Sequence, residues 1–206
     1  MIELKAIRRG LGRLVLAAAG ICAAGCSDGS GNVLVPRPEG YPRIELYPPS
    51  YTVVSPVGGL SLEVNSGAVV DTARIGGAAE TTSRWFNLQY PDYRAVIYCT
   101  YTPVDKASVA SVLDNRRERM ALNSGGLPGE IVEVENRNGV TGQLLVTPAG
   151  SVNPVQFLAT DSRRFVLSGA MTFIGAATVD ADSVAPVVDA VCADMIHMLT
   201  TLSWTR

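Results

Sequence analysis

Beyond residue 40, the spacing of apolar and polar positions predicts a run of β-strands and two helices. Residues 84–90 alternate between apolar and polar side chains, Pro91 and Asp92 supply a turn, and 94–102 returns as a second strand. Further strands are predicted at 60–64, 68–70, 131–136, 141–147, 154–160 and 164–174. Because the last four strands have short links rich in turn-forming residues, we expect them to be antiparallel neighbours.

Two segments carry apolar residues at helical spacing. In the first, 105–122, one face of the predicted helix carries Val109, Val112, Leu113, Arg116 and Met120. The segment 183–201 has an apolar stripe from Val184 to Leu199, and Asp182 or Ser183 is its predicted N-cap. That stripe must be buried against the sheet.

The last strands carry apolar residues at positions that point to both faces of the sheet. In one of them, Phe157 and Ala159 point to one face and Leu158 to the other. A sheet that is apolar on both faces needs cover on both faces. We therefore predict an α+β fold in which one antiparallel sheet is flanked by helices on both faces, an α-β-α sandwich. The proline-rich stretch 41–56 is expected to lie extended along the domain or a sheet edge, and 74–83 to form a loop.

The first 25 residues have the features of a bacterial lipoprotein signal peptide. Four basic residues precede a short apolar segment, 14–25, which ends in Ala-Ala-Gly before Cys26. A membrane-spanning helix needs about 20 apolar residues, so this segment is too short to be one. We predict cleavage before Cys26 and attachment of lipid, with palmitate-type acyl chains, to its thiol. An uncleaved anchor helix, or a plain secretory signal cut elsewhere, is the alternative.

The mature chain divides into a tether and one domain. Residues 26–40 are rich in Gly and Ser and then in Pro, which is typical of a flexible tether, and 41–206 is expected to form a single α+β domain. Removal of the signal peptide takes away four of 17 basic and one of 19 acidic residues, leaving a net charge near minus 5. That balance does not favour nucleic acid as a partner.

Only Cys99 and Cys192 would remain as thiols in the domain. In an oxidising periplasm they could form a disulfide. The alternative is that both are small buried hydrophobic residues, since Cys99 falls in a strand pattern and Cys192 on the apolar face of a helix. No cysteine or histidine spacing indicates a metal site, and no motif indicates a cofactor.

Five segments resemble, in order and spacing, the gliding motility-associated lipoprotein GldD family of Bacteroidetes. They are YPRIELYPPSY (41–51), RWFNLQYPDY (84–93), VQFLATDS (155–162), FVLSGAMTF (165–173) and SVAPVVDAVCADM (183–195). The resemblance implies a cell-envelope lipoprotein needed by the gliding machinery, which is coupled to type IX secretion. The hairpin-rich layout is also similar to the PsbP/Mog1 type of sandwich, a likeness of fold that carries no function.

Candidate catalytic residues are few. A hydrolase would need to bring together Asp161, Ser162 and the single histidine, His197. Turn chemistry accounts for Asp161 and Ser162, and a boundary position on a helix accounts for His197. Three further acidic residues are interpreted as helix-capping rather than calcium-binding groups: Asp180, Asp182 and Asp189. We therefore expect no enzymatic activity.

Two surfaces are candidates for contact with partners. The first is the proline-rich strip with Tyr41, Arg43, Tyr47 and Tyr51, whose rings could instead clamp the strip onto the domain's own core. The second is a basic patch in the first helix, formed by Arg116, Arg117 and Arg119. We interpret this patch as a solvated helix face balanced by Asp114 and Glu118, and contact with anionic lipid or an acidic partner is the alternative.

The sequence thus favours a non-enzymatic envelope lipoprotein that binds or assembles partners of the gliding and secretion apparatus. The alternative function is a periplasmic lipoprotein that binds a small ligand or glycan, which requires a pocket between sheet and helix. The lipid would hold the domain at a membrane, facing the periplasm. Ser27 after the cysteine favours the outer over the inner membrane by the sorting rule of other bacteria.

Overall fold

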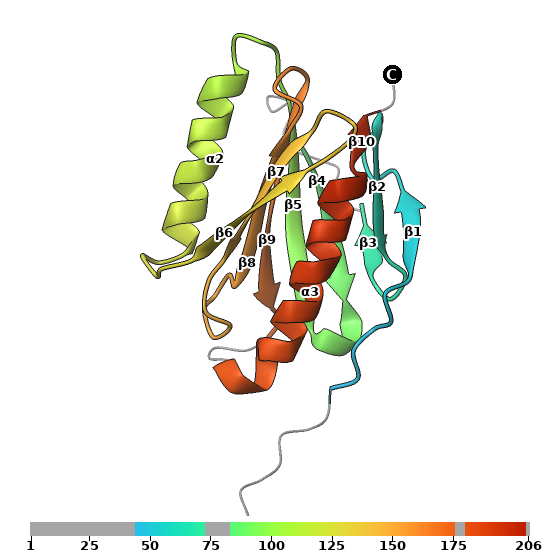
Figure 1. Cartoon of the computed structure of the whole chain (residues 1–206), viewed down its shortest axis with the longest axis vertical. Helices are drawn as coiled ribbons and strands as arrows, with labels where there is room; N and C mark the ends of the chain where they lie inside the picture. The colour runs from blue at the N-terminus through green and yellow to red at the C-terminus, as the bar shows by residue number, and fades with distance from the viewer. Residues whose placement is uncertain (1–43, 73–82, 176–179, 205–206) are drawn as a thin grey trace, which may run out of the picture. The chain divides into compact units, whose positions relative to one another are not determined.

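The computed structural model describes residues 44–72, 83–175 and 180–204, all within the unit Tyr41–Arg206 (Figure 1). Its two long helices are α2 (Val109–Asn123) and α3 (Ala181–Thr201), and a short 3₁₀ turn, η1, covers Pro91–Tyr93. The strands are β1 (Tyr51–Val54), β2 (Leu60–Asn65), β3 (Val69–Asp71), β4 (Arg84–Tyr90), β5 (Ala95–Pro103), β6 (Glu130–Glu135), β7 (Thr141–Val146), β8 (Val155–Thr160), β9 (Phe165–Phe173) and β10 (Ser203–Trp204). The signal peptide and tether, with Cys26, and most of the predicted loop 74–83 lie outside the described residues.

Seven strands form one antiparallel sheet in the order β3-β4-β5-β9-β8-β7-β6. The strands predicted from alternation are confirmed, and β4 has the predicted limits. The predicted antiparallel pairing of the last four strands is also confirmed, with β8 between β7 and β9. Every residue of β8 is buried, as the apolar character of both its faces requires.

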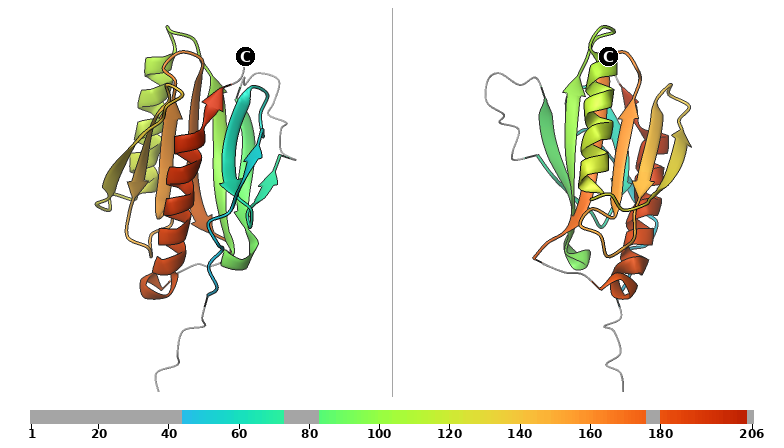
Figure 2. Two further views of the ribbon diagram at one scale, coloured as in Figure 1. Left: turned by 45° about the vertical axis from the view of Figure 1, so that its right-hand side comes forward. Right: turned by 90° about the vertical axis from the view of Figure 1, so that its left-hand side faces the viewer.

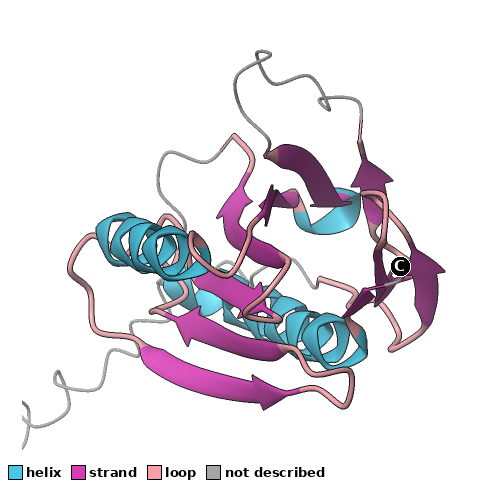
Figure 3. Ribbon diagram, turned by 90° about the horizontal axis from the view of Figure 1, so that it is seen from above, coloured by secondary structure: helices cyan, strands magenta, loops and turns pink. Residues whose placement is uncertain are grey.

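The prediction of a single sheet is wrong, because β1, β2 and β10 form a separate three-stranded antiparallel sheet. Its central strand, β2, pairs with β1 on one side and with β10 on the other. Leu60, Leu62 and Val64 turn inward from β2 and are buried. Seen from above, this small sheet lies beside one end of α3 and away from α2 (Figure 3). The described fold is therefore α+β with two antiparallel sheets and two helices.

The two helices pack on different sets of side chains from the seven-stranded sheet. The α2 helix packs through Met120 on Leu158 and Val166. Residues of the opposite phase, Phe157 and Leu167, belong to the core cluster that includes α3 and β2. Alternate residues of a strand point to opposite faces, so the helices cover opposite faces, as Figure 2 shows.

The α3 helix is the apolar centre of the domain. It is long and apolar enough, by length and composition alone, to span a bilayer. Its buried residues nevertheless pack inside the domain: Val187, Val188, Val191, Asp194, Met195, Met198 and Leu199. Its N-cap is Asp180, not Asp182 or Ser183, and the Asp180 carboxylate accepts a hydrogen bond from the Ser183 hydroxyl at 2.7 Å.

The α2 helix begins at Val109, four residues later than the predicted start. The Asp105 carboxylate accepts hydrogen bonds from the backbone N–H groups of Ala107 and Ser108, at 3.1 and 2.8 Å. These bonds have the pattern of an N-cap, so Asp105 caps the turn 106–108, from which the helix continues at Val109.

Candidate functional site

Tyr47 fastens the proline-rich strip to the seven-stranded sheet. Its ring stacks on that of Tyr93, with 4.5 Å between centroids, and its hydroxyl accepts a hydrogen bond from the backbone N–H of Asp92 at 3.2 Å. The Tyr93 hydroxyl in turn accepts one from the backbone N–H of Tyr47 at 2.5 Å. A side chain at Gly67 would meet this ring, because a Cβ atom there would lie 2.6 Å from it. The strip is therefore closely fitted to the domain.

Tyr51 fastens the strip a second time, to α3. Its hydroxyl donates to Oδ1 of Asp194 at 3.1 Å, and the side-chain amide of Asn65 donates to the same oxygen at 3.1 Å. Asp194 is only 7% exposed and Asn65 only 2%. A buried carboxylate is tolerated because these donors replace water. Burial, together with this carboxylate, raises the pKa of Tyr51.

These contacts favour, for Tyr47 and Tyr51, the alternative in which the rings clamp the strip onto the domain. Both hydroxyl groups are bonded within the domain. Tyr41 and Arg43, the other two members of the predicted partner surface, lie outside the described residues.

His197 lies beside this clamp. Its Nε2 is 2.7 Å from Oε2 of Glu63, and its ring stacks on that of Tyr51, with 3.6 Å between centroids. Asp194, three positions before His197 on the same helix, is bonded to Tyr51 and Asn65 instead. The partner, Glu63, comes from β2 and is 134 positions away, too far for sequence spacing to indicate.

Asp161 and Ser162 form the turn between β8 and β9. Oδ1 of Asp161 accepts hydrogen bonds from the backbone N–H groups of Arg163 and Arg164, and its Oδ2 pairs with Nε of Arg164 at 2.6 Å. Ser162 has a φ of 57°, in the left-handed region. No hydrogen bond joins either residue to His197 in the described part of the chain. The interpretation of Asp161 as a turn residue is confirmed.

The two cysteines of the described residues, Cys99 and Cys192, are free thiols, and the disulfide that the sequence left open is not formed. Cys99 is 1% exposed in β5, opposite Gly169 of β9, and belongs to the core cluster. Burial raises its pKa far above the ordinary value. Cys192 packs at the margin of the same cluster, and burial, with Asp189 and Glu130 nearby, raises its pKa. Their role as small hydrophobic residues is the one that the structure supports.

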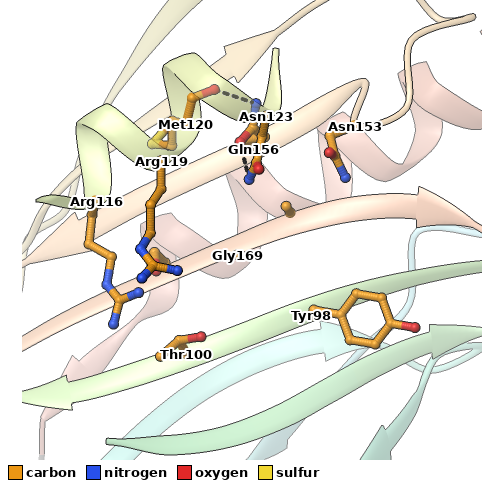
Figure 4. Close-up of a pocket in the computed structure, with 11 residues that line it drawn as sticks. Tyr98, Thr100, Arg116, Arg119, Met120, Asn123, Asn153, Gln156 and Gly169 are labelled. Atoms are coloured by element: carbon orange, nitrogen blue, oxygen red, sulfur yellow. Dashed lines mark hydrogen bonds between the residues drawn. The ribbon is translucent and has the colours of Figure 1, made fainter. Parts of the chain in front are cut away.

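A polar groove lies on the other side of the sheet, between α2 and strands β5, β8 and β9 (Figure 4). Its volume is about 300 Å³. Eleven residues line it: Tyr98, Thr100, Arg116, Arg119, Met120, Asn123, Asn153, Gln156, Ser168, Gly169 and Ala170. The pairing of β5 with β9 determines which side chains form the floor of the groove: Tyr98 lies opposite Ala170, and Thr100 lies opposite Ser168. These side chains therefore share the face that α2 covers.

Two arginines give the groove its charge. Nη2 of Arg116 donates to the hydroxyl of Thr102 at 2.9 Å, and Nε of Arg119 donates to the side-chain oxygen of Asn115 at 3.3 Å. Nε of Arg116 is buried and has no hydrogen-bond partner. Neither guanidinium forms an ion pair with a carboxylate of the described residues. Burial and, second, the charge of Arg119 lower the pKa of Arg116.

Side-chain amides hold the upper wall of the groove in place. Gln156, only 1% exposed, donates to the carbonyl of Met120 at 3.1 Å and accepts from the amide of Asn123 at 3.3 Å. Asn153 donates to the carbonyl of Met171 at 3.0 Å. These bonds hold the side chains of this wall in place.

Comparison with protein families matches residues 31–204 to the gliding motility lipoprotein GldD family. The chain belongs to this family. No curated protein matches the chain. The match confirms the resemblance of the five segments, and membership of a lipoprotein family supports a lipid-anchored place in the cell envelope.

The GldD assignment identifies no site residue, and sequence reasoning had missed the groove. The interpretation of the basic patch as a solvated helix face is confirmed for Arg117 and Arg119, which are exposed, and Arg117 pairs with Asp114 at 3.3 Å. Arg116 departs from it, because its side chain is half-buried. The available signal was the presence of Arg116 among the apolar positions of the helix, since an arginine on the buried side points to a polar neighbour below.

Proposed function

We propose that this lipoprotein is a non-enzymatic partner-binding or assembly factor, accessory to the gliding motility and type IX secretion machinery. The observation that carries the proposal is the GldD family match over residues 31–204. The signal-like sequence before Cys26 adds a means of anchoring to the membrane.

Support for a non-enzymatic role comes from the candidate catalytic residues. His197 is engaged with Glu63 and Tyr51, and Asp161 is engaged with its own turn and Arg164. A nucleophile and its base must lie within hydrogen-bond reach of each other, directly or through one water. The engagements of His197 and Asp161 favour structural roles for both.

The proposed location is the periplasmic side of the envelope, with the outer membrane favoured by Ser27. Two or more acyl chains on Cys26 would hold the domain firmly, since a single chain binds only marginally. The 15-residue stretch 26–40 is the proposed tether between membrane and domain. We also propose that the arrangement of sheet and helices is of the PsbP/Mog1 sandwich type. This proposal concerns the fold and implies no function.

A pull-down tests the leading proposal. The native lipidated protein, solubilised with its membranes in mild detergent, is recovered and the associated proteins are identified by mass spectrometry. Recovery of envelope components of the gliding or secretion apparatus is expected. Recovery of the lipoprotein alone, in a host where that apparatus is expressed, contradicts a partner-binding role.

The polar groove favours a second candidate function, the binding of a small ligand or glycan. Such a function requires space between a helix and the sheet, and the α2 side provides about 300 Å³. Titration of the lipoprotein in detergent with a panel of monosaccharides, followed by calorimetry, tests this candidate. Absence of binding by the whole panel contradicts it.

A further inference from the structure

We propose that the groove beside α2 binds an acidic sugar, with Arg116 and Arg119 holding its oxoanion and Tyr98 packing against its ring. This inference deepens the ligand-binding candidate and rests on it. It does not depend on whether the lipoprotein also binds protein partners.

The charge of the groove selects an anion. Arg116 and Arg119 lie three positions apart, one helical turn, so both side chains reach the same side of α2. Figure 4 shows both guanidinium groups extending from the helix toward β5, above Thr100. No carboxylate of the described residues lines the groove. Two close positive charges without a counter-ion repel each other, and a bound carboxylate or phosphate would remove that repulsion.

The hydrogen-bonding groups of Arg116 are incompletely used. Its Nη2 bonds to Thr102, but its buried Nε has no partner among the described residues. A buried donor without an acceptor costs free energy, and the fork of a guanidinium matches two oxygens of one carboxylate or phosphate. The guanidinium of Arg116 also lines the groove, so an oxoanion bound there can accept hydrogen bonds from the edge that faces it.

The size and polarity of the groove favour a single sugar over an apolar ligand. A volume of about 300 Å³ stands at the lower end of the range of about 300–1,000 Å³ for small-molecule sites. Asn123, Gln156 and Asn153 contribute amides already held by other bonds, and Thr100 and Ser168 contribute hydroxyls. Such groups suit the several hydroxyls of a sugar.

Tyr98 supplies a flat surface at the opposite end from the arginines. Tyr98 is 53% exposed although it belongs to a central strand of the sheet. It lies two positions before Thr100 along the strand, a distance of roughly 7 Å. Figure 4 shows the ring beyond Thr100, away from both guanidinium groups. One pyranose ring can therefore lie over Tyr98 while its acidic group contacts the arginines.

Calorimetric titration of the lipidated protein in detergent tests the inference with defined probes. The probes are glucuronate, glucose, glucose 6-phosphate, glycerol phosphate and inorganic phosphate. We expect glucuronate or glucose 6-phosphate to bind about tenfold or more tightly than glucose, because charge-assisted hydrogen bonds are lost with the neutral sugar. We also expect both acidic sugars to bind more tightly than inorganic phosphate.

Variants assign the binding to the groove. Arg119→Gln should weaken binding of the acidic sugar about tenfold, whereas Arg117→Gln should leave it within about twofold. Arg117 is the matched control, because it lies on the same helix, pairs with Asp114 and does not line this groove. Tyr98→Ala should weaken binding of the acidic sugar and leave inorganic phosphate unaffected. Unfolding midpoints of all variants establish that each is folded.

Each other outcome overturns the inference in a defined way. Equal binding of glucose and glucuronate excludes the anion preference and leaves a ligand-binding function standing. Tightest binding by glycerol phosphate identifies a lipid headgroup instead of a sugar. Equal loss in Arg117→Gln and Arg119→Gln places the anion outside the groove. Absence of binding by every probe, with the protein folded, overturns the inference, while the monosaccharide panel still decides on the ligand-binding candidate and the pull-down on partners.

Discussion

Asp194 illustrates how a single buried carboxylate joins the proline-rich strip, the small sheet and α3. It is 7% exposed and accepts hydrogen bonds from Tyr51 and Asn65. Its replacement by alanine would leave both donors without an acceptor. We expect Asp194→Ala to lower the free energy of unfolding by about 2–3 kcal/mol, measured by urea denaturation.

The control for this prediction is Asp189→Ala, at an exposed position of the same helix. Its free energy of unfolding should stay within about 0.5 kcal/mol of the wild type, or rise slightly, since alanine favours a helix more than aspartate. Equal losses in the two variants would mean that the clamp contributes no specific stability.

Asp161 should make the stability depend on pH. Burial raises the pKa of its carboxyl group, but hydrogen bonds from Arg164, Arg163 and Phe165 outweigh burial and lower that pKa below the ordinary value of 3.8. A carboxyl with a lowered pKa stabilises the fold above about pH 4, and this stabilisation disappears as the pH falls through the folded-state pKa. We therefore expect Asp161→Asn to be about 1–2 kcal/mol less stable at about pH 7, with the difference shrinking below about pH 4.

Urea denaturation at a series of pH values measures this difference. Asp114→Asn is the control, because Asp114 is 78% exposed in its pair with Arg117 and surface pairs contribute about 0–1 kcal/mol. A stability gap for Asp161→Asn that is the same at all pH values would contradict the role of its charge.

Among the strands, β9 passes so close to β8 that only glycine fits at one position. A Cβ atom on Gly169 would lie 2.4 Å from Cε1 of Phe157 and 3.2 Å from Cγ2 of Ile97. Phe157 and Ile97 are each 1% exposed and have little space to move. We expect Gly169→Ala to lower the free energy of unfolding by about 1–3 kcal/mol, measured by urea denaturation.

Gly58→Ala is the matched control, because nothing lies within 4 Å of a Cβ atom there. That variant should unfold at the wild-type urea concentration or slightly higher, since alanine reduces the entropy of the unfolded chain. If Gly169→Ala is as stable as the wild type, the side chains of Phe157 and Ile97 can move to admit a methyl group, and the prediction is wrong.

The strands and helices were predictable where burial imposes a period on the sequence. The limits of β4 follow from alternation alone, and α3 follows from its apolar stripe. β10 was not predictable, because Ser203–Trp204 are too few residues for a pattern. Its place depends on contacts from elsewhere: Trp204 pairs with Leu60 and stacks at 5.5 Å on Tyr101.

For the whole molecule, sequence reasoning reached the family and the fold class more readily than any site. The polar groove combines Tyr98 of β5, Arg116 of α2, and Asn153 and Gln156 from β8 and the stretch that leads into it, which are three separate segments. Each taken alone has an ordinary structural explanation. Only the register of β5, β8 and β9, together with the position of α2 above them, brings these side chains to one surface. The spacing of residues within one segment does not indicate which side chains of other segments will lie beside them.

The attachment of the whole domain to the envelope depends, in our prediction, on one sulfur atom. Cys26→Ser should move the protein from the membrane fraction to the soluble fraction, because a hydroxyl is not the acceptor that lipid attachment to a cysteine requires and several acyl chains provide the affinity. Cys22→Ser is the matched control, since Cys22 lies four positions earlier without Ala-Ala-Gly before it, and should stay in the membrane fraction.

Fractionation with immunodetection, and intact mass of the purified protein, measure both effects. Membrane retention of unlipidated Cys26→Ser would show that something other than lipid holds the protein at the envelope; intact mass then separates an uncleaved N-terminal segment from the domain itself or its partners.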